Sequence, residues 1–143
     1  MMWGQHLIVD MSSCNLTAVA DKERIHAFCD ELVEKIDMVP YGEPLIKHFA
    51  KHDPQVSGYT LVQLIETSNI TAHFVENVGD VYLDVFSCKE FAQGRVLEIC
   101  RDFFSPLTLH ATNLSRDAGH FPSITWSWPS SNHLQPDLIK CTL

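Results

Sequence analysis

The stretch QLIETSNITAH, residues 63–73, gathers a carboxylate, hydroxyls, a carboxamide and a histidine between apolar runs. Two strand-like runs overlap it, YTLVQLIE (59–66) and ITAHFVE (70–76), and a third, DVYLDVFSC (80–88), follows. Runs of this length, rich in β-branched and aromatic residues and bounded by turn residues, are typical of strands. The polar break between the first two runs therefore predicts a hairpin turn or a reactive site placed at one.

Hydrophobic periodicity places the other elements of the chain. Apolar residues recur at helical spacing after Asp21, a candidate N-cap, and this pattern ends before Pro40. Residues 40–58 hold three prolines and two glycines, so they are expected to form a connection. The remaining expected elements are a helix from Lys89 to about Phe104 and strands at 5–11 and 107–114.

The element order expected from these patterns is β-α-β-β-β-α-β. Strands collected beside two helices are typical of an α+β domain, here a two-layer sandwich with an antiparallel sheet and both helices on one face. The other sheet face needs a cover, and a second copy of the chain is an economical one, so a homodimer is expected. Residues 1–143 are expected to form one domain, with a core at about 2–115 and an irregular tail at about 116–143.

Composition argues against several classes of partner and place. The formal net charge of −8, without a basic run, argues against nucleic-acid binding. No stretch approaches the roughly 20 apolar residues that span a bilayer, and the start of the sequence lacks the pattern of a signal peptide. Five scattered cysteines without Cys-x-x-Cys pairs fit free thiols better than disulfides or a zinc site, so a cytoplasmic protein is expected.

A serine held at a strained turn can cut its own chain. With a base or hydrogen-bond donors nearby, the Ser68 hydroxyl could attack the Thr67 carbonyl and form an ester. Elimination across the serine and hydrolysis of the imine would then break the chain and leave a pyruvoyl group. Its ketone is an electron sink that can support amino-acid decarboxylation, as pyridoxal phosphate does.

Three motifs carry a resemblance to a known family: WGQHLIVDMSSC (3–14), TSNITAH (67–73) and YLDVFSC (82–88). They resemble motifs of the prokaryotic S-adenosylmethionine decarboxylases. The first is similar to the family's opening strand, a Gly-x-His-Leu followed by an acidic residue and a cysteine. The second is similar to the family's Glu-Ser-His-Leu-Thr-Ile-His, and the third to its Ala-Ile-Asp-Leu-Phe-Thr-Cys. These decarboxylases are small pyruvoyl-dependent enzymes of spermidine synthesis. The resemblance covers roughly residues 2–115 in element order.

The resemblance implies a role for each matched position. It places Ser68 at the pyruvoyl-forming serine, His73 at the processing histidine and Cys88 at the proton donor that acts after decarboxylation. The separation of fifteen positions between His73 and Cys88 is also that of the family. The implied enzyme is a dimer of chains cleaved between Thr67 and Ser68, in which the substrate amine forms a Schiff base with the pyruvoyl group near the dimer interface.

Departures from the family pattern concern the substrate more than the pyruvoyl chemistry. Thr67 stands where the family has Glu or Lys, and Asn69 replaces a histidine. The Trp-Pro-Glu that follows the histidine in the family is absent, and Glu76 falls one residue before the position of the ribose-binding glutamate.

Other polar residues near the break allow two interpretations each. The upstream hydroxyl that assists processing could be Ser57, by its Val-Ser-Gly context, or Thr60, by its distance from Ser68. Glu66 could pair with a substrate amine or be a solvated edge carboxylate. His48 and His52 have helical metal-ligand spacing, but they lie in a proline-flanked stretch with no third ligand, so no metal site is expected.

Three functions remain open on the sequence alone. The favoured one is decarboxylation of S-adenosylmethionine, a cation that suits an acidic protein. Arginine or ornithine, also cationic, would suit a pyruvoyl decarboxylase of the same fold that lacks the ribose contacts. The third is an unprocessed homologue that binds a ligand or regulates a partner, in which Ser68 is only a turn residue, His73 a strand histidine and Cys88 a small core residue.

Overall fold

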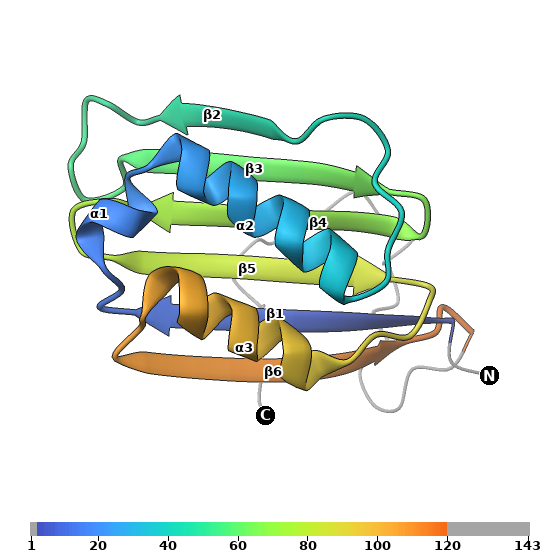
Figure 1. Cartoon of the computed structure of the whole chain (residues 1–143). Coiled ribbons are helices and arrows are strands. Elements are labelled where there is room, and N and C mark those ends of the chain that lie inside the picture. Colours follow the sequence, from blue (N-terminus) through green and yellow to red (C-terminus); the bar gives the residue numbers. More distant parts are fainter. Residues whose placement is uncertain (1–2, 120–143) are drawn as a thin grey trace, which may run out of the picture.

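The computed structural model describes residues 3–119, whose strands form one antiparallel sheet of six strands (Figure 1). The spatial order is β2-β3-β4-β5-β1-β6, and every neighbouring pair is antiparallel. No helix in this part of the chain is long and apolar enough to cross a membrane. In chain order the elements are β1 (Gly4–Ser12), α1 (Leu16–Val19), α2 (Lys22–Lys35), β2 (Leu45–Phe49), β3 (Gly58–Ile65), β4 (Ser68–Val75), β5 (Asp80–Ser87), α3 (Gln93–Phe104) and β6 (Thr108–Arg116).

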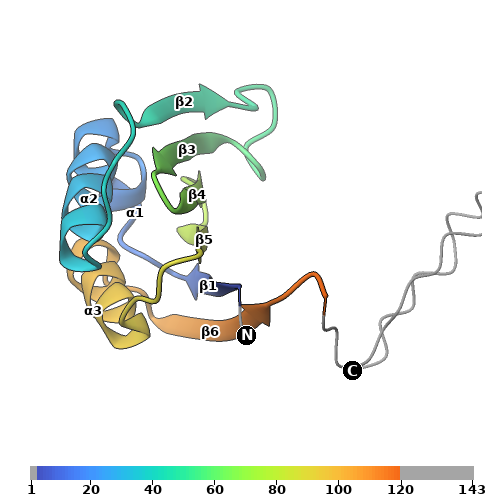
Figure 2. The same ribbon diagram turned by 90° about the vertical axis from the view of Figure 1, so that its right-hand side faces the viewer.

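All three helices cover one face of the sheet, which confirms the expected two-layer α+β fold (Figure 2). Helix α2 begins as its sequence predicts, because the Asp21 carboxylate accepts hydrogen bonds from two backbone N–H groups of the first turn. Its apolar stripe, which includes Ile25, Phe28 and Leu32, is fully buried against the sheet. The core therefore lies between the helices and one face of the sheet.

Strict alternation divides the sheet into a buried face and an open face. In β5 the side chains of Val81, Leu83 and Val85 are fully buried, whereas Tyr82 between them is 47% exposed. We call the face turned away from the helices the open face. It carries several exposed apolar side chains from four strands: Leu45, Phe49, Leu64, Tyr82 and Leu114.

The structure contains two elements that the sequence did not predict, and one of them corrects the expectation that residues 40–58 form only a connection. Residues 40–58 are not only a connection, because Leu45–Phe49 form the edge strand β2. Pro44 and Pro54 flank this strand instead of interrupting it, and Ile46 is buried at its centre. The second addition is the short helix α1, which Asn15 caps through its side chain.

The remaining differences are shifts of boundaries. Helix α3 begins at Gln93, not at Lys89, because the Gln5 side chain hydrogen-bonds to both the N–H and the C=O of Phe91 and holds that segment out of the helix. The last strand continues to Arg116, so the expected tail begins later than predicted. The rest of that tail, from residue 120 on, lies outside the described residues.

Candidate active site

The break in QLIETSNITAH is the two-residue turn of the β3–β4 hairpin. Ile65 pairs with Ser68 at the mouth of this turn, which leaves Glu66 and Thr67 as the turn residues. Neighbouring backbone holds the turn from the side. The Glu66 N–H donates to the Val39 carbonyl at 3.0 Å, and Pro40 forms a bridge with Ile65. The exit of helix α2 therefore fixes one side of the turn.

The end of β5 fixes the other side. The Thr67 carbonyl accepts a hydrogen bond of 3.0 Å from the Cys88 backbone N–H. Ser87, the last residue of β5, pairs with Ser68 across the sheet. The carbonyl of the predicted cleavage site thus faces a hydrogen-bond donor supplied by the residue predicted as the catalytic cysteine.

Ser68 has an unusual backbone conformation. Its φ is +152°, a value that side-chain-bearing residues rarely adopt. Its hydroxyl makes no hydrogen bond to any residue between 3 and 119, so it is available to react. Rare backbone conformations persist where the surrounding structure enforces them, and they cluster at functional sites.

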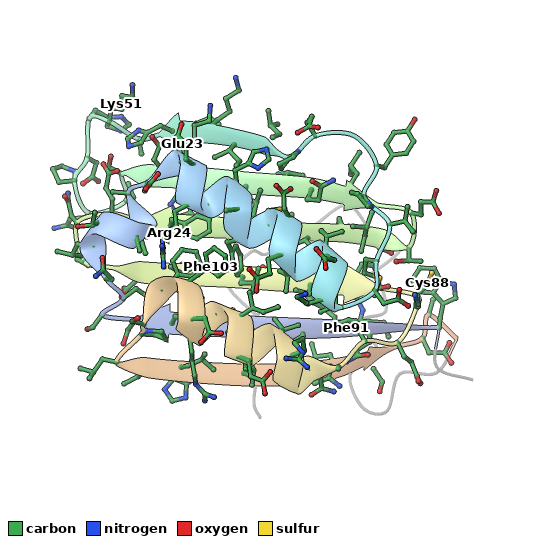
Figure 3. The ribbon with its side chains drawn as sticks, viewed as in Figure 1. Glu23, Arg24, Lys51, Cys88, Phe91 and Phe103 are labelled. Atoms are coloured by element: carbon green, nitrogen blue, oxygen red, sulfur yellow. The ribbon has the colours of Figure 1, made fainter. Side chains whose placement is uncertain are left out.

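Cys88 differs from the other cysteines in the described residues. Its side chain is exposed, and Figure 3 shows it at the end of the sheet where β5 stops. Burial raises the pKa of the Cys14 thiol to about 11 and the pKa of the Cys29 and Cys100 thiols to about 12. Cys88 is therefore the accessible thiol of the described chain, next to the predicted cleavage site.

His73 lies on the open face and is paired with Thr60. Its Nε2 lies 3.3 Å from the Val56 carbonyl, which can only accept, so Nε2 carries the proton in this contact. Nδ1 then accepts from the Thr60 hydroxyl at 2.9 Å. Of the two upstream hydroxyls considered from the sequence, Thr60 is the one in contact with His73.

Ser57 belongs to a different cluster, which includes His48 and Glu76. The Ser57 hydroxyl donates to the Glu76 carboxylate at 3.1 Å, and His48 Nε2 lies 3.0 Å from both carboxylate oxygens. The ring of Tyr59 packs edge-on against His48. Both oxygens of Glu76 are thus engaged within the protein, at the opposite end of β4 from Ser68.

The structure does not bring every predicted residue together within one chain. Ser68 and His73 are five residues apart on one extended strand, which corresponds to roughly 17 Å. Five is an odd number, so their side chains also belong to opposite faces of the sheet. The site of cleavage and the histidine predicted to assist it are therefore separated in a single copy.

The two remaining predicted residues flank the turn. The Glu66 side chain is exposed, whereas Asn69 is half-buried on the open face, where it pairs with Phe86 of β5. Among residues 3–119, no group of three or more His, Cys, Asp or Glu side chains is placed to hold a metal ion. His48, considered as a metal ligand in the sequence, is instead engaged by Glu76.

An aromatic hollow at the same end of the sheet was not identified from the sequence. Trp3 and Phe86 have ring centroids 5.8 Å apart, and the Arg116 guanidinium lies 4.9 Å from the centroid of the Phe86 ring. These three residues line an open hollow together with Asp117 and Ala118. The sequence carries only a weak signal for this hollow, because Trp3, Phe86 and Arg116 come from distant parts of the chain: Trp3 directly precedes β1, Phe86 lies in β5 and Arg116 ends β6.

Comparisons with known proteins agree with this fold and motif set. A family model described as S-adenosylmethionine decarboxylase matches residues 5–117. A relative from Archaeoglobus fulgidus, named S-adenosylmethionine decarboxylase proenzyme, is 28% identical over 88 residues, which are 62% of this chain and 73% of the relative. A relative of the same name from Clostridium botulinum is 27% identical over 92 residues, 64% of this chain and 74% of the relative.

A solved structure shows the same fold over nearly the whole described region. The crystal structure of the adenosylmethionine decarboxylase from Aquifex aeolicus superposes with a TM-score of 0.70 at 18% identity, covering 87% of this chain and 98% of that one. The family model matches well over half of the chain and includes all the candidate site residues. The protein therefore belongs to the S-adenosylmethionine decarboxylase family, as its three motifs indicated.

Proposed function

We propose that this chain is a self-processing, pyruvoyl-dependent decarboxylase of S-adenosylmethionine that supplies decarboxylated S-adenosylmethionine for spermidine synthesis. The observation that carries the proposal is the geometry of the Thr67–Ser68 peptide. Its carbonyl accepts from the Cys88 N–H, and the residue that follows has a strained backbone and an unpartnered hydroxyl among the described residues. An acyl transfer from nitrogen to oxygen needs this combination of donor and nucleophile.

The processing steps follow from these groups. The Ser68 Oγ bonds to the Thr67 carbonyl carbon, the C–N bond breaks, and the hydroxyl proton passes to the released amine. The Cys88 N–H stabilises negative charge on the Thr67 oxygen while the tetrahedral intermediate exists. Removal of the Ser68 α-proton then expels the Thr67 carboxylate, and water converts the remaining imine into a ketone and ammonia.

The residues of the turn fit a pyruvoyl group at position 68. When formed, that group supplies the electron sink for decarboxylation of an amino acid. Because Cys88 is exposed and its backbone contacts Thr67, its thiol is well placed to give a proton to the substrate Cα after CO₂ leaves. Asn69, on the open face beside Phe86, is available to bind the substrate.

A homodimer of cleaved protomers would complete the site. His73 is roughly 17 Å from Ser68 in one chain, too far to take the α-proton of the same copy. The open face carries His73 and Thr60 among exposed apolar side chains, as expected for a surface that a second copy covers. In such a pair, His73 of one chain would serve Ser68 of the other.

The aromatic hollow favours a substrate that carries a ring. Trp3 and Phe86 offer π faces, and Phe86 is two residues from Cys88 and pairs with Asn69 beside Ser68. An adenine ring could stack there, whereas arginine and ornithine have no ring to place. The acidic net charge is compatible with all three cationic substrates.

One observation favours the runner-up, a pyruvoyl decarboxylase of arginine or ornithine. Glu76, the candidate ribose-binding carboxylate, already has both oxygens engaged by His48. Ribose recognition through Glu76 would require that pair to open. Glu66 is exposed beside the cleavage site and could instead pair with the second amine of a basic amino acid.

Intact mass under denaturing conditions tests the processing step, with Ser68→Ala as the control. Two fragments that separate between Thr67 and Ser68, the larger one with a blocked terminus, are expected for the unaltered chain and none for the variant. A substrate panel of S-adenosylmethionine, arginine and ornithine then tests the reaction by CO₂ release. One uncut chain, stable over days, would favour a non-catalytic homologue, and decarboxylation of arginine or ornithine alone would overturn the substrate.

We also infer a cytoplasmic location for this enzyme. The four cysteines within residues 3–119 are free thiols, which suits a reducing compartment. Cell fractionation tests this inference, since recovery of the protein with a membrane or outside the cell would contradict it.

A further inference from the structure

The side chain of Thr67 is held by a part-buried hydrogen-bond network at the end of β5. The Ser87 hydroxyl donates to Thr67 Oγ1 at 2.8 Å, and Thr67 Oγ1 in turn donates to the Met38 sulfur at 3.2 Å. The backbone N–H of Lys89 donates to Ser87 Oγ at 3.0 Å, and Ser87 is fully buried. The hydroxyl groups of Thr67 and Ser87 therefore both have partners, as a well-ordered polar network requires.

Thr67 is attached to β5 at two consecutive residues. Its hydroxyl is bound to the side chain of Ser87, and its carbonyl is bound to the backbone of Cys88. Two hydrogen bonds from one residue to one strand end restrict the rotation of the Thr67–Ser68 peptide plane. The hydroxyl bond thereby keeps the carbonyl directed at the Cys88 N–H.

An ion pair closes the network on its far side. The Lys89 ammonium contacts both the Asp37 carboxylate, at 2.6 Å, and the Asp37 carbonyl. Asp37 directly precedes Met38, so the segment that receives the Thr67 hydroxyl is itself tied to the residue that follows Cys88. The exit of α2 and the exit of β5 are thus joined to each other around Thr67.

We propose that the hydroxyls of Ser87 and Thr67 are positioning residues for self-cleavage: they hold the Thr67 carbonyl against the Cys88 N–H while Ser68 attacks. The proposal rests on the proposed function and deepens it. The step affected is ester formation, in which the Oγ–C bond forms, the C–N bond breaks and the hydroxyl proton goes to nitrogen. The network touches no atom that reacts, so its effect is on the alignment of the carbonyl.

This assignment gives a physical reason for threonine at position 67. A short hydroxyl can accept from Ser87 and donate to Met38 at the same time, within a half-buried site. A glutamate there could only accept, and it would carry a charge into contact with a thioether. In this chain, the side chain before Ser68 is therefore part of the local packing.

The test measures the rate of self-cleavage after the full chain is made in a cell-free system, by intact mass over time. Thr67→Val and Ser87→Ala are each expected to slow cleavage by roughly tenfold or more, because misalignment of reacting groups is costly. Thr67→Ser keeps the hydroxyl and is expected to restore the rate to within about twofold. Ser115→Ala, at an exposed position of β6, is the matched control and is expected to leave the rate unchanged.

Two further readouts separate positioning from general destabilisation. The double variant Thr67→Val/Ser87→Ala is expected to be no slower than the slower single variant, since both act through one bond. Hydroxylamine, which cleaves esters, is expected not to rescue either variant, because the delay precedes the ester. It is expected to cut a His73→Ala chain, in which ester formation is intact and elimination fails.

The outcomes keep the two proposals distinct. If the unaltered chain is cut and both variants are cut at the same rate, the positioning role is wrong and the proposed function stands. An uncut wild-type chain overturns the proposed function and this inference with it. If circular dichroism shows that Ser87→Ala is unfolded, the pair Thr67→Val and Thr67→Ser decides, because equal rates for these two would exclude a role for the hydroxyl.

Discussion

The two ends of β4 carry different kinds of chemical group. At the Ser68 end, backbone groups dominate: the Thr67 carbonyl and its donor, the Cys88 N–H, lie among neutral hydroxyls and a thioether. At the other end, ionisable side chains dominate, with His73 bound by Thr60 and Glu76 bound by His48. One end holds the carbonyl of the predicted cleavage site against a backbone donor, and the other holds the histidine that is predicted to assist cleavage.

This difference suggests that neither end works alone. Proton removal needs a base within hydrogen-bond reach of the proton, whereas the strand separates the two ends by roughly five residue steps of 3.3 Å. A second copy of the chain, placed on the open face, could bring one end of each strand to the opposite end of its partner. The predictions below test this division, from the largest expected effect to the smallest.

The sharpest test mixes two inactive chains. Neither Ser68→Ala nor His73→Ala is expected to complete cleavage alone. When equal amounts of the two chains are refolded together, a mixed dimer contains one complete site, so up to about half of the His73→Ala chains should be cut. Intact mass distinguishes the two chains. Cleavage of His73→Ala alone, at the wild-type rate, would show that each copy is self-sufficient and that the division is wrong.

Thiol reactivity should separate Cys88 from the buried cysteines. The pKa of the Cys14 thiol is about 11 and that of the Cys29 and Cys100 thiols about 12, each above the ordinary 9.0, so they stay protonated at pH 8. Their thiolate fractions are lower than that of an ordinary thiol by roughly 100- to 1000-fold, and labelling should rise only as the pH approaches those values. Native alkylation at pH 8, read by peptide mapping, should therefore modify Cys88 first among these four. Comparable labelling of Cys29 would contradict this assignment.

Substitution of the two upstream hydroxyls should decide between them. Thr60→Val removes the partner of His73 Nδ1 and is expected to slow the elimination step by roughly tenfold, the effect of one hydrogen bond to a reacting side chain. Ser57→Ala touches Glu76 instead and is expected to change the cleavage rate less. The reverse order of the two rates would assign the assisting role to Ser57.

The smallest effect is expected at Glu76. Glu76→Gln weakens its contact with His48 and should lower the free energy of unfolding by about 1 kcal/mol, or roughly 4 °C in melting temperature. Glu98→Gln, in an exposed pair with Arg95, is the control and should have less effect. A large rise in KM for S-adenosylmethionine, without a change in stability, would instead make Glu76 a substrate-binding residue.

Much of the fold could be predicted because burial enforces local patterns. The alternation in β5 and the stripe of α2 are visible in the sequence, since each has one buried face. Strand β2 could not be recognised in the same way, because it is an edge strand of five residues between two prolines and buries little beyond Ile46. Proline in a sequence indicates a break, but not on which side of it a strand lies.

The candidate site was only partly predictable, for a different reason. The resemblance of two motifs to the family predicts Ser68, His73 and Cys88, but the partners of these residues depend on strand register, which a single sequence does not give. The Thr67 carbonyl meets Cys88, and Thr60 meets His73, only because β3, β4 and β5 pair as they do. The network of Ser87 with Met38 joins residues 49 positions apart and leaves no local signal in the sequence.

The strand order has a consequence for the two fragments that cleavage would produce. Residues 1–67 supply β1, β2 and β3, while the chain from Ser68 onward supplies β4, β5 and β6. Because β1 lies between β5 and β6, strands of the two fragments alternate within one sheet. Separation of the fragments would break three strand pairings, namely β3–β4, β5–β1 and β1–β6, so the cleaved chains would stay associated. The chain would therefore have to fold before it is cleaved, and the separated fragments would not be expected to reassemble as the intact chain does.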